Sequence, residues 1–267
     1  MKAPVTGVQL YTLRRFTKTY DDLARTLARL ADWSVRDLQF SALGPEITPQ
    51  EQKELLDRFG MRVCVTHQSF ARLRDELPAV IEAHKVIGCD SVGLGYTPED
   101  CRADEDTARA YVKTLSEIAQ TLKKNGLQFH YHNHDFELKP LPGSDVTLMD
   151  LLLHETDPAL VHFIPDVAWL HYAGVDPAPF LRRIAGRTKV VHFKDYVLRE
   201  DGSPQFVSLG RGCVDLSACF SVCGELQIPY VMYEQDNGWT DDDPFLSTKE
   251  SLEYFDVLTA DLERRPV

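Results

Sequence analysis

The sequence predicts an α/β protein built as one (β/α)₈ TIM barrel, and three observations support this prediction. A strand–helix alternation repeats eight times along the 267 residues, a length typical of one such barrel. The apolar runs of the later strands each stop at an ionisable residue, as expected where strand ends carry a site. No linker, low-complexity run or change of composition divides the chain, so we expect residues 1–267 to form a single domain.

The first half of the chain supplies four strand–helix units. Apolar, β-branched segments predict strands at residues 5–11, 35–40, 61–66 and 91–94. We expect the helices that follow them at residues 20–33, 48–59, 76–87 and 104–124. Thr48, Pro49 and Glu51 have the order of an N-cap, a first-turn proline and a capping-box glutamate. Gly60 and Gly88 are typical helix stops.

The second half repeats this plan. The expected strands cover residues 127–132, 160–166, 188–193 and 229–234. The expected helices cover residues 146–155, a segment beginning near 176–177, and residues 216–226 and 248–262. Strands that alternate with helices form a parallel sheet, and eight units favour closure into a barrel. An open doubly wound sheet would need a glycine-rich loop after the first strand, and residues 9–14 contain no glycine.

The charge balance limits the partners of the protein. Lysine and arginine number 29 against 41 acidic residues, which gives a formal net charge of −12. Such a surface repels nucleic acid backbones and anionic lipids, so we expect neither nucleic acid nor membrane as a partner. No apolar leader segment and no stretch of about 20 apolar residues occurs, which predicts a cytoplasmic protein.

Three histidines follow one another along the fifth predicted strand. Phe129 and Tyr131 share one parity of this strand and suit packing against helices. His130, His132 and His134 have the other parity and are expected to face the barrel axis. Buried imidazoles need hydrogen bonds or a metal to offset their desolvation. The strand therefore indicates a polar site at its C-terminal end.

The next three strands also end in residues that can bind a metal. Strand six ends at Asp166, strand seven at His192 and strand eight at Glu234. The alternative for each carboxylate is to cap the helix that follows. Together with His132 these residues form a mixed nitrogen and oxygen set at one rim of the barrel. Such a set suits Mn²⁺, Co²⁺, Fe²⁺ or Zn²⁺ better than Ca²⁺, so we predict one divalent metal ion.

Six segments spread over almost the whole chain form a recognisable set. They are GVQLYTLR at 7–14, YHNHDFE at 131–137, DVAWLHYAGVDP at 166–177, VHFKD at 191–195, LGRG at 209–212 and YEQDN at 233–237. In these segments the chain resembles the xylose-isomerase-like TIM-barrel superfamily of sugar (phosphate) isomerases and epimerases, in its YHNHDFE-type subgroup. The resemblance implies a small sugar substrate, a bound divalent ion (Mn favoured over Co, Fe, Zn or Mg) and allows a homo-oligomer.

The resemblance also implies roles for individual residues. In better-characterised relatives a Glu, an Asp, a His and a second Glu from strands five to eight hold the metal. Asp166, His192 and Glu234 match the last three. The first position is His132 here, and Glu137 is the alternative strand-five ligand. Because the two glutamates of the epimerases move a proton between two faces of a carbon, this departure weakens a two-base C3-epimerase assignment.

The resemblance to isomerases and epimerases implies proton transfer beside a carbonyl. A hydroxy-ketone sugar bound to the metal through two oxygens becomes acidic at the adjacent carbon, and the enediolate is stabilised. We expect Glu234 or Glu137 as the base and His134 or Lys194 as the acid. Lys194 could instead form a solvated ion pair with Asp195.

Three further residues are candidates for substrate binding. Gln9 and His67 lie at the same rim and could bind hydroxyl groups or serve as structural hydrogen-bonding groups. Trp169 stands where relatives often carry a second histidine, and it could stack on a sugar or fill the barrel mouth. We expect an isomerase or epimerase. A lyase or dehydratase of inososes or 3-keto-sugars is the alternative, and a non-catalytic sugar-binding barrel is the second alternative.

Overall fold

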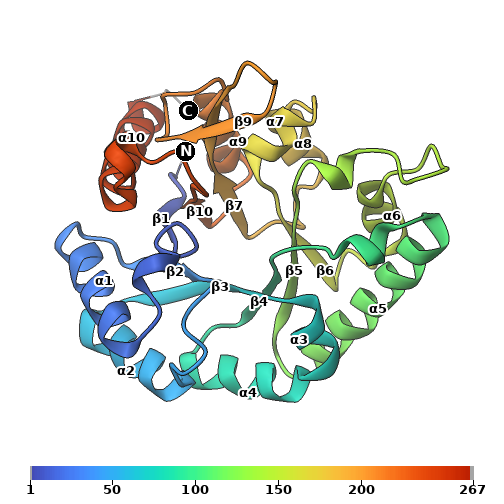
Figure 1. The fold of residues 1–267 in the computed structure, drawn as a ribbon, viewed down its shortest axis with the longest axis horizontal. Helices are drawn as coiled ribbons and strands as arrows, with labels where there is room; N and C mark the ends of the chain where they lie inside the picture. The colour runs from blue at the N-terminus through green and yellow to red at the C-terminus, as the bar shows by residue number, and fades with distance from the viewer. Residues whose placement is uncertain (1, 265–267) are drawn as a thin grey trace.

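The computed structural model describes residues 2–264 and forms a ring of parallel strands surrounded by helices (Figure 1). The ring runs in the order β6-β5-β4-β3-β2-β1-β10-β7, and every pairing in it is parallel. Its strands are β1 (Val5–Gln9), β2 (Asp37–Phe40), β3 (Arg62–Gln68), β4 (Ser91–Leu94), β5 (Gln128–His132), β6 (Val161–Ile164), β7 (Val190–Phe193) and β10 (Tyr230–Tyr233). The predicted (β/α)₈ TIM barrel is confirmed.

The ring closes between β6 and β7 through fewer contacts than elsewhere. Two isolated parallel bridges join the strands there, Phe163 with Thr188 and Asp166 with His192. The Phe163 N–H donates to the Arg187 carbonyl at 2.7 Å, and the His192 N–H donates to the carbonyl of Pro165 at 2.9 Å. We call this closing junction the β6–β7 seam.

Helices cover the outside of the ring (Figure 1). They are α1 (Tyr20–Asp32), α2 (Pro49–Phe59), α3 (Phe70–Asp75), α4 (Leu77–Ile87), α5 (Glu105–Lys124), α6 (Leu148–Glu155), α7 (Val167–Tyr172), α8 (Pro177–Arg183), α9 (Leu216–Glu225) and α10 (Pro244–Arg264). The predicted capping box of α2 is present, because Thr48 and Glu51 exchange hydrogen bonds. Gly60 ends this helix at φ 62°, a left-handed conformation that favours glycine.

Side-chain parity separates two layers of buried residues. Phe129 and Tyr131 are fully buried in the layer between strands and helices, as predicted. Inside the ring lies a small apolar cluster of Cys64, Val65, Ile164, Val190 and Met232. His130 and His132 have the opposite parity to the aromatic pair and are also buried. Among the described residues, no helix is both long and apolar enough to cross a membrane.

Several elements depart from the predicted plan. The short helices α3 and α7 follow β3 and β6 directly, and the segment expected as strand to residue 166 stops at Ile164. An antiparallel hairpin, β8 (Asp195–Leu198) with β9 (Pro204–Val207), lies after β7 and outside the ring. Its turn contains Asp201 and Gly202, a pair typical of such connections.

Asp195 holds the segment between the hairpin and α9 in place. Its carboxylate accepts hydrogen bonds at 2.9–3.1 Å from the backbone N–H groups of Tyr196, Gly210, Gly212 and Val214. A Cβ on Gly212 would lie 2.2 Å from Asp195 Oδ1, so the close approach requires glycine. The LGRG turn thus encloses a buried carboxylate.

We expect Asp195→Ala to destabilise the protein strongly. Hydrogen bonds to a charged acceptor each contribute roughly 1.5–3 kcal/mol, and water can replace only part of the four lost bonds. The free energy of unfolding, measured by urea denaturation, should fall by about 3 kcal/mol or more. Asp201→Ala, in the exposed hairpin turn, is the matched control and should change little. Equal stability of the two variants would contradict this account of the turn.

Candidate metal centre

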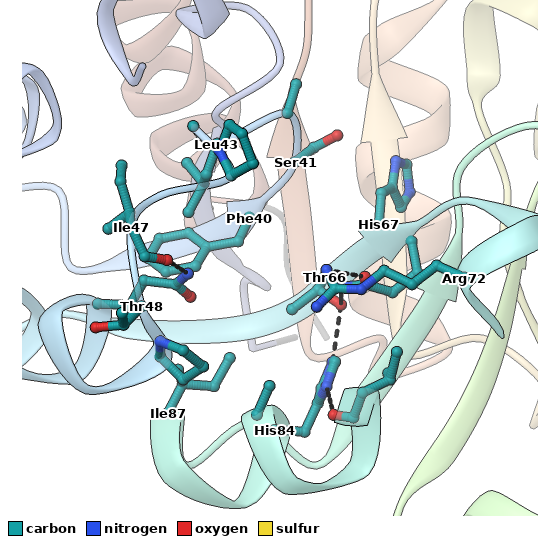
Figure 2. Close-up of a pocket in the computed structure, with 18 of the residues that line it drawn as sticks. Phe40, Ser41, Leu43, Ile47, Thr48, Thr66, His67, Arg72, His84 and Ile87 are labelled. Atoms are coloured by element: carbon teal, nitrogen blue, oxygen red, sulfur yellow. Dashed lines mark hydrogen bonds between the residues drawn. The ribbon is translucent and has the colours of Figure 1, made fainter. Parts of the chain in front are cut away.

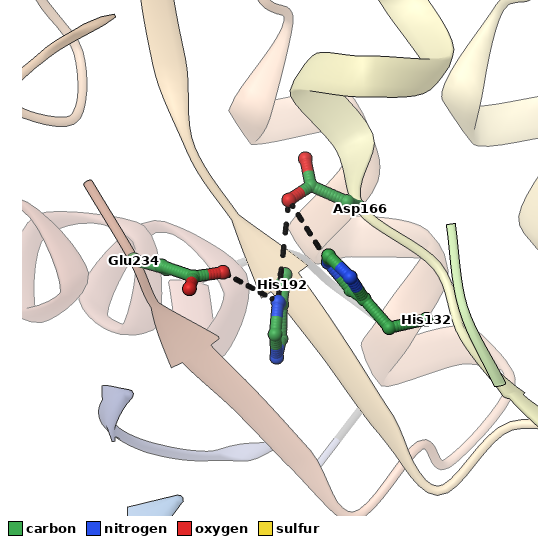
Figure 3. A group of neighbouring side chains, drawn as sticks. All are labelled: His132, Asp166, His192 and Glu234. Atoms are coloured by element: carbon green, nitrogen blue, oxygen red, sulfur yellow. Dashed lines mark hydrogen bonds and ion pairs between the residues drawn. The ribbon is translucent and has the colours of Figure 1, made fainter. Parts of the chain in front are cut away.

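Four side chains from four strand ends converge at one rim of the barrel (Figure 3). They are His132, Asp166, His192 and Glu234, and we call them the His-Asp-His-Glu group. Each offers one ligand atom, and these atoms all lie within 4.8 Å of one another. All four residues are buried. The sequence-based expectation that the later strand ends converge is met.

The backbone register brings the four residues together. The bridge across the β6–β7 seam places Asp166 beside His192, and the Glu234 N–H donates to Phe193 O at 3.1 Å. His192 Nδ1 lies 2.9 Å from Glu234 Oε2 and 4.0 Å from Asp166 Oδ2. His132 Nε2 lies 3.4 Å from the same Asp166 oxygen. The centre of the group is therefore lined by two nitrogens and two carboxylate oxygens.

Each imidazole is oriented by its outer nitrogen. His132 Nδ1 lies 3.3 Å from the Gly95 carbonyl oxygen, and His192 Nε2 lies 2.7 Å from Gln39 Oε1. Since both partners are acceptors, these outer nitrogens carry the hydrogens. The inner nitrogens of His132 and His192 then present lone pairs to the group. Such anchoring is the usual support of metal-binding histidines.

The carboxylates also leave one oxygen each for the group. Asp166 Oδ1 caps α7 by accepting the N–H groups of Ala168 and Trp169, while Oδ2 faces the histidines. Asp166 thus combines the capping role with the position expected of a ligand. His192 Nδ1 is buried without a hydrogen-bond partner and faces Glu234 Oε2 at 2.9 Å, while the ammonium of Lys194 lies 3.1 Å from the same oxygen. A divalent ion held by the four residues would also pair the free nitrogen of His192, so the donor set fits a divalent metal.

Lys194 is buried against the same carboxylates. Its Nζ lies 3.2 Å from Asp166 Oδ2, 3.1 Å from Glu234 Oε2 and 3.1 Å from Asp236 Oδ2. Burial opposes the ammonium charge, but the three carboxylates outweigh it and raise the pKa of Lys194 well above its usual value. The expected alternative, a solvated pair with Asp195, is wrong, because Asp195 is occupied by backbone N–H groups.

The group opens into a cavity of about 640 Å³, which is within the usual range of small-molecule sites. We call it the reaction cavity. Aromatic rings and polar side chains line it together, among them Tyr11, Phe70, Tyr96, Trp169, His67, His134, Lys194 and Asp236. Three of these residues contribute a buried nitrogen without a partner, at His67 Nε2, His134 Nδ1 and Trp169 Nε1. These nitrogens are themselves covered, so they are unpaired polar groups in the residues of the cavity wall rather than on its open surface.

Gln9 lies behind His67 rather than on the cavity wall. Its Nε2 is 3.3 Å from His67 Nδ1, and its Oε1 accepts the Tyr11 N–H at 3.2 Å. Gln9 does not appear among the residues that line the reaction cavity. Of the three predicted substrate-binding residues, His67 and Trp169 therefore line the cavity. Gln9 does not line it and contacts His67 instead.

Glu137 is placed away from the His-Asp-His-Glu group. It is fully buried, and its carboxylate accepts the Tyr131 hydroxyl at 2.9 Å and the His134 N–H at 2.7 Å. It does not line the reaction cavity. The hydroxyls of Tyr131 and Tyr111 both contact Thr97, which extends the buried network to α5. Glu137 therefore positions the backbone of His134, and His132 takes the strand-five place in the group.

Burial raises the pKa of Glu137 from 4.5 to about 7, against the opposing hydrogen bonds from His134 and Tyr131. Because the folded pKa exceeds the unfolded one, folding favours the protonated acid. The wild type should lose about 3 kcal/mol of stability as pH rises from ~4.5 to ~7. Glu137→Gln stays neutral, so its free energy of unfolding should change less over this range.

The measurement is urea denaturation of the wild type and the Glu137→Gln variant at several pH values between 4.5 and 8, without metal. The exposed Glu117 supplies the control variant Glu117→Gln, whose pH profile should follow the wild type. Parallel profiles for Glu137→Gln and the wild type would mean that folding does not raise the pKa of Glu137.

Three site residues were not predicted from the sequence. Asp236 contacts Lys194, Gln39 anchors His192, and Asn133 Oδ1 accepts the Asp166 N–H at 3.1 Å. A glutamine in the middle of a short buried strand was the available signal for Gln39. Asp236 and Asn133 stand in the YEQDN and YHNHDFE segments, next to residues already singled out.

Comparison with known proteins agrees with this geometry. The family model of the xylose isomerase-like TIM barrel matches residues 4–256. An inosose dehydratase of Geobacillus kaustophilus is 27% identical over 172 residues, covering 59% of this chain and 54% of the relative. The chain thus spans about half the length of this curated relative.

Solved structures show the same fold. A sugar phosphate isomerase/epimerase from Parabacteroides distasonis superposes with a TM-score of 0.77 at 22% identity, covering 98% of this chain and 96% of that one. A xylose isomerase-like TIM barrel protein from Mycobacterium smegmatis, in complex with magnesium, has a TM-score of 0.68 at 16% identity, with 97% and 98% covered. From the matched residues and the barrel that carries them, this chain belongs to the xylose isomerase-like TIM-barrel family.

Proposed function

We propose that the protein is a divalent-metal-dependent isomerase or epimerase of a small sugar or keto-sugar, with His132, Asp166, His192 and Glu234 as the metal ligands. The observation that supports it most directly is the buried His-Asp-His-Glu group, in which the inward nitrogen of His192 has no hydrogen-bond partner. The mixed donor set suits Mn²⁺, Co²⁺, Fe²⁺ or Zn²⁺ better than Ca²⁺. Among these ions and Mg²⁺ we favour Mn²⁺, on the resemblance to sugar isomerases and epimerases. We further propose that residues 1–267 act as one domain, alone or as a homo-oligomer.

A divalent ion bound by this group would polarise a substrate carbonyl and stabilise the negative charge that develops on its oxygen. Glu234, the carboxylate of the group that lines the reaction cavity, takes a proton from the carbon beside that carbonyl. Lys194 and His134, both on the cavity wall, are the proton donors or hydrogen-bond donors to the charged oxygen. His67 and Trp169, both on the cavity wall, are the residues that contact the substrate hydroxyl groups.

A single base at this centre suits transfer of one proton between neighbouring carbons. Glu137 is withdrawn from the cavity, and His132 replaces the strand-five carboxylate of the two-base epimerases. Aldose–ketose isomerisation needs only one such base, whereas epimerisation with two bases needs a carboxylate on each side. We therefore place isomerisation ahead of two-base epimerisation.

Dehydration or elimination is the second candidate. It is favoured by the histidine at the strand-five position and by the similarity to inosose dehydratases, at 27% identity over 172 residues. The same proton removal at Glu234 would then be followed by loss of a β-oxygen substituent, with Lys194 or His134 donating the proton to the departing oxygen.

The test is incubation of the Mn²⁺-loaded protein with a panel of ketoses, inososes and 3-keto-sugars in D₂O. Deuterium at the carbon beside the carbonyl, with the mass otherwise retained, is expected for an isomerase or epimerase. Loss of water or of an aglycone would assign the lyase instead. Absence of exchange with every compound, together with less than one bound metal per chain, would favour a non-catalytic sugar-binding barrel.

A further inference from the structure

Four charged side chains form a continuous cluster at the mouth of the barrel. Lys194 Nζ lies 3.2 Å from Asp166 Oδ2 and 3.1 Å from Glu234 Oε2, and it also lies 3.1 Å from Asp236 Oδ2. We call these four residues the charge cluster. Asp166 and Glu234 belong to the His-Asp-His-Glu group as well, whereas Asp236 does not. In this cluster the proposed metal ligands therefore share an ammonium with a third carboxylate.

The ammonium contacts the same carboxylate oxygens that face the histidines. Glu234 Oε2 lies 2.9 Å from His192 Nδ1, and Asp166 Oδ2 lies 3.4 Å from His132 Nε2. These two oxygens are also the ones that Lys194 Nζ contacts. A divalent ion at the inward nitrogens would thus share both oxygens with a second positive charge. Because like charges repel strongly where water is excluded, the ammonium needs another partner when an ion binds.

The charges of the cluster balance when a divalent ion is added. Three carboxylates face one ammonium, which leaves a net charge of −2. The two imidazoles of the His-Asp-His-Glu group carry their hydrogens on the outer nitrogens and add no charge. Unbalanced buried charge is unfavourable, so a doubly charged cation is the complement. Such an ion would neutralise Asp166 and Glu234, and Asp236 would remain as the counterion of Lys194.

Arg72 is also a cation near the mouth of the barrel, but it does not serve the charge cluster. It lies on the wall of a second cavity of about 450 Å³, between β3 and the helices α2 and α4 (Figure 2). Its guanidinium donates to Gln68 Oε1 at 3.1 Å and lies 3.6 Å from Glu76 Oε2. No aspartate or glutamate is found among the described residues that line this second cavity. Lys194 is thus the cation that partners the carboxylates of the reaction cavity.

The main chain fixes Asp236 beside the ammonium. The Gln235 N–H donates to Thr12 Oγ1 at 3.0 Å, and the Arg14 guanidinium donates to the Asp236 carbonyl oxygen at 2.8 Å. The side chain of Asp236 is 22% exposed against 2% for Lys194, and both residues line the reaction cavity. Asp236 therefore lies on the more open side of the charge cluster, where it can hold Lys194 at the cavity wall.

Resting on the proposed function, we propose that Asp236 is a positioning residue, which holds the Lys194 ammonium while the His-Asp-His-Glu group holds a divalent ion. This pairing leaves the oxygens of Asp166 and Glu234 to the ion. It also keeps the ammonium on the wall of the reaction cavity, where the proposed proton donor has to be. Asp236 thus sets the metal affinity of a group to which it does not belong.

Titration of the full chain with Mn²⁺ at pH 7.5, without substrate, tests this role. The electron paramagnetic resonance signal of free Mn²⁺ gives the dissociation constant. Asp236→Asn removes the counterion and keeps the size of the side chain, so we expect Mn²⁺ to bind about 10–100 times more weakly, as for other residues that support metal ligands. Asp236→Glu keeps the charge and should recover most of this loss. Asp256→Asn, at an exposed position of α10, makes the same change in net charge and should bind Mn²⁺ like the wild type.

Stability without metal separates this role from a structural one. In EDTA, Asp236→Asn removes one of the excess negative charges, so its urea midpoint should not fall below that of the wild type. A lower midpoint together with weaker Mn²⁺ binding would assign Asp236 to folding and overturn the proposal. Weaker Mn²⁺ binding without loss of stability is the result that supports it.

A double-mutant cycle with Lys194→Met tests whether Asp236 acts through the ammonium. Without Lys194 there is no ammonium to hold, so adding Asp236→Asn should weaken Mn²⁺ binding much less than it does in the wild type. Equal factors in both backgrounds would overturn the proposal. If Lys194→Met does not fold without metal, the rescue by Asp236→Glu and the midpoint in EDTA decide the question.

The outcomes distinguish this proposal from the proposed function. If the wild type binds one Mn²⁺ per chain and Asp236→Asn binds it equally tightly, the metal-dependent function stands and the positioning role of Asp236 fails. If the wild type itself binds less than one Mn²⁺ per chain at saturation, both fail.

Discussion

The Glu234→Gln variant is expected to lose turnover by about a thousandfold or more with any substrate that the wild type converts. A positioned general base contributes about 10²–10⁴ in rate, and the amide can neither accept the proton nor supply the negative charge of a ligand. Glu234 Oε2 is also the oxygen that lies 2.9 Å from His192 Nδ1. Removal of the carboxylate therefore affects both the proton transfer and the metal affinity.

The variant should be measured at saturating Mn²⁺ so that the two effects separate. Metal content by elemental analysis gives the loss of affinity, and the rate of the fully loaded protein gives the loss of the base. The Glu117→Gln variant, changed at the surface of α5, should keep wild-type turnover and metal content. Unchanged turnover of Glu234→Gln would remove Glu234 from the mechanism and with it the proposed assignment.

The Lys194→Met variant should be the most destabilised of the site variants when no metal is present. Lys194 is 2% exposed and neutralises carboxylates of Asp166, Glu234 and Asp236 that lie 3.1–3.2 Å from it. Removing one partner of a buried ion pair costs about 3–5 kcal/mol, because the remaining charges stay desolvated. Urea denaturation in EDTA measures this loss directly.

A divalent ion should then rescue Lys194→Met more than it stabilises the wild type. The ion would supply positive charge at the same carboxylates, and a ligand that binds only the folded state adds stability according to its affinity. Lys189→Met is the control, since Lys189 pairs with Asp90 away from the His-Asp-His-Glu group. It should show a smaller loss and the same metal response as the wild type. If the divalent ion stabilises Lys194→Met no more than it stabilises the wild type, Lys194 does not neutralise the carboxylates that would bind the ion.

The sequence was sufficient for the barrel because its signals are local. The capping box at Thr48, the glycine stop at Gly60 and the strand–helix alternation need only neighbouring residues to be recognised. Helix α7 was not predicted, because six residues are too few to show a helical periodicity of apolar positions. The strand-like sequence before it also continues up to Asp166. The β8–β9 hairpin did carry a turn signal, Asp201-Gly202, but lies outside the barrel plan.

The candidate site was predictable to the extent that strand ends converge by rule. Parity and the common rim indicated His132, Asp166, His192 and Glu234 without any contact information. Long-range packing decided the rest. Nothing local tells that Glu137 turns toward Tyr131, that Lys194 avoids its neighbour Asp195, or that Gln39 reaches a histidine 153 positions away.

Two of the proposed metal ligands also lie at the β6–β7 seam, where they can affect the closure of the barrel. Where two isolated bridges replace a continuous ladder, amide hydrogens should exchange with solvent sooner than in the rest of the ring. Asp166 and His192 lie on opposite sides of this junction. An ion bound by both residues would hold the two strands together. The protection of the His192 amide hydrogen from exchange should therefore increase with metal occupancy. Closure of the barrel at this seam and binding of the metal ion would then be coupled, and the exchange rate of the His192 amide hydrogen would report on both.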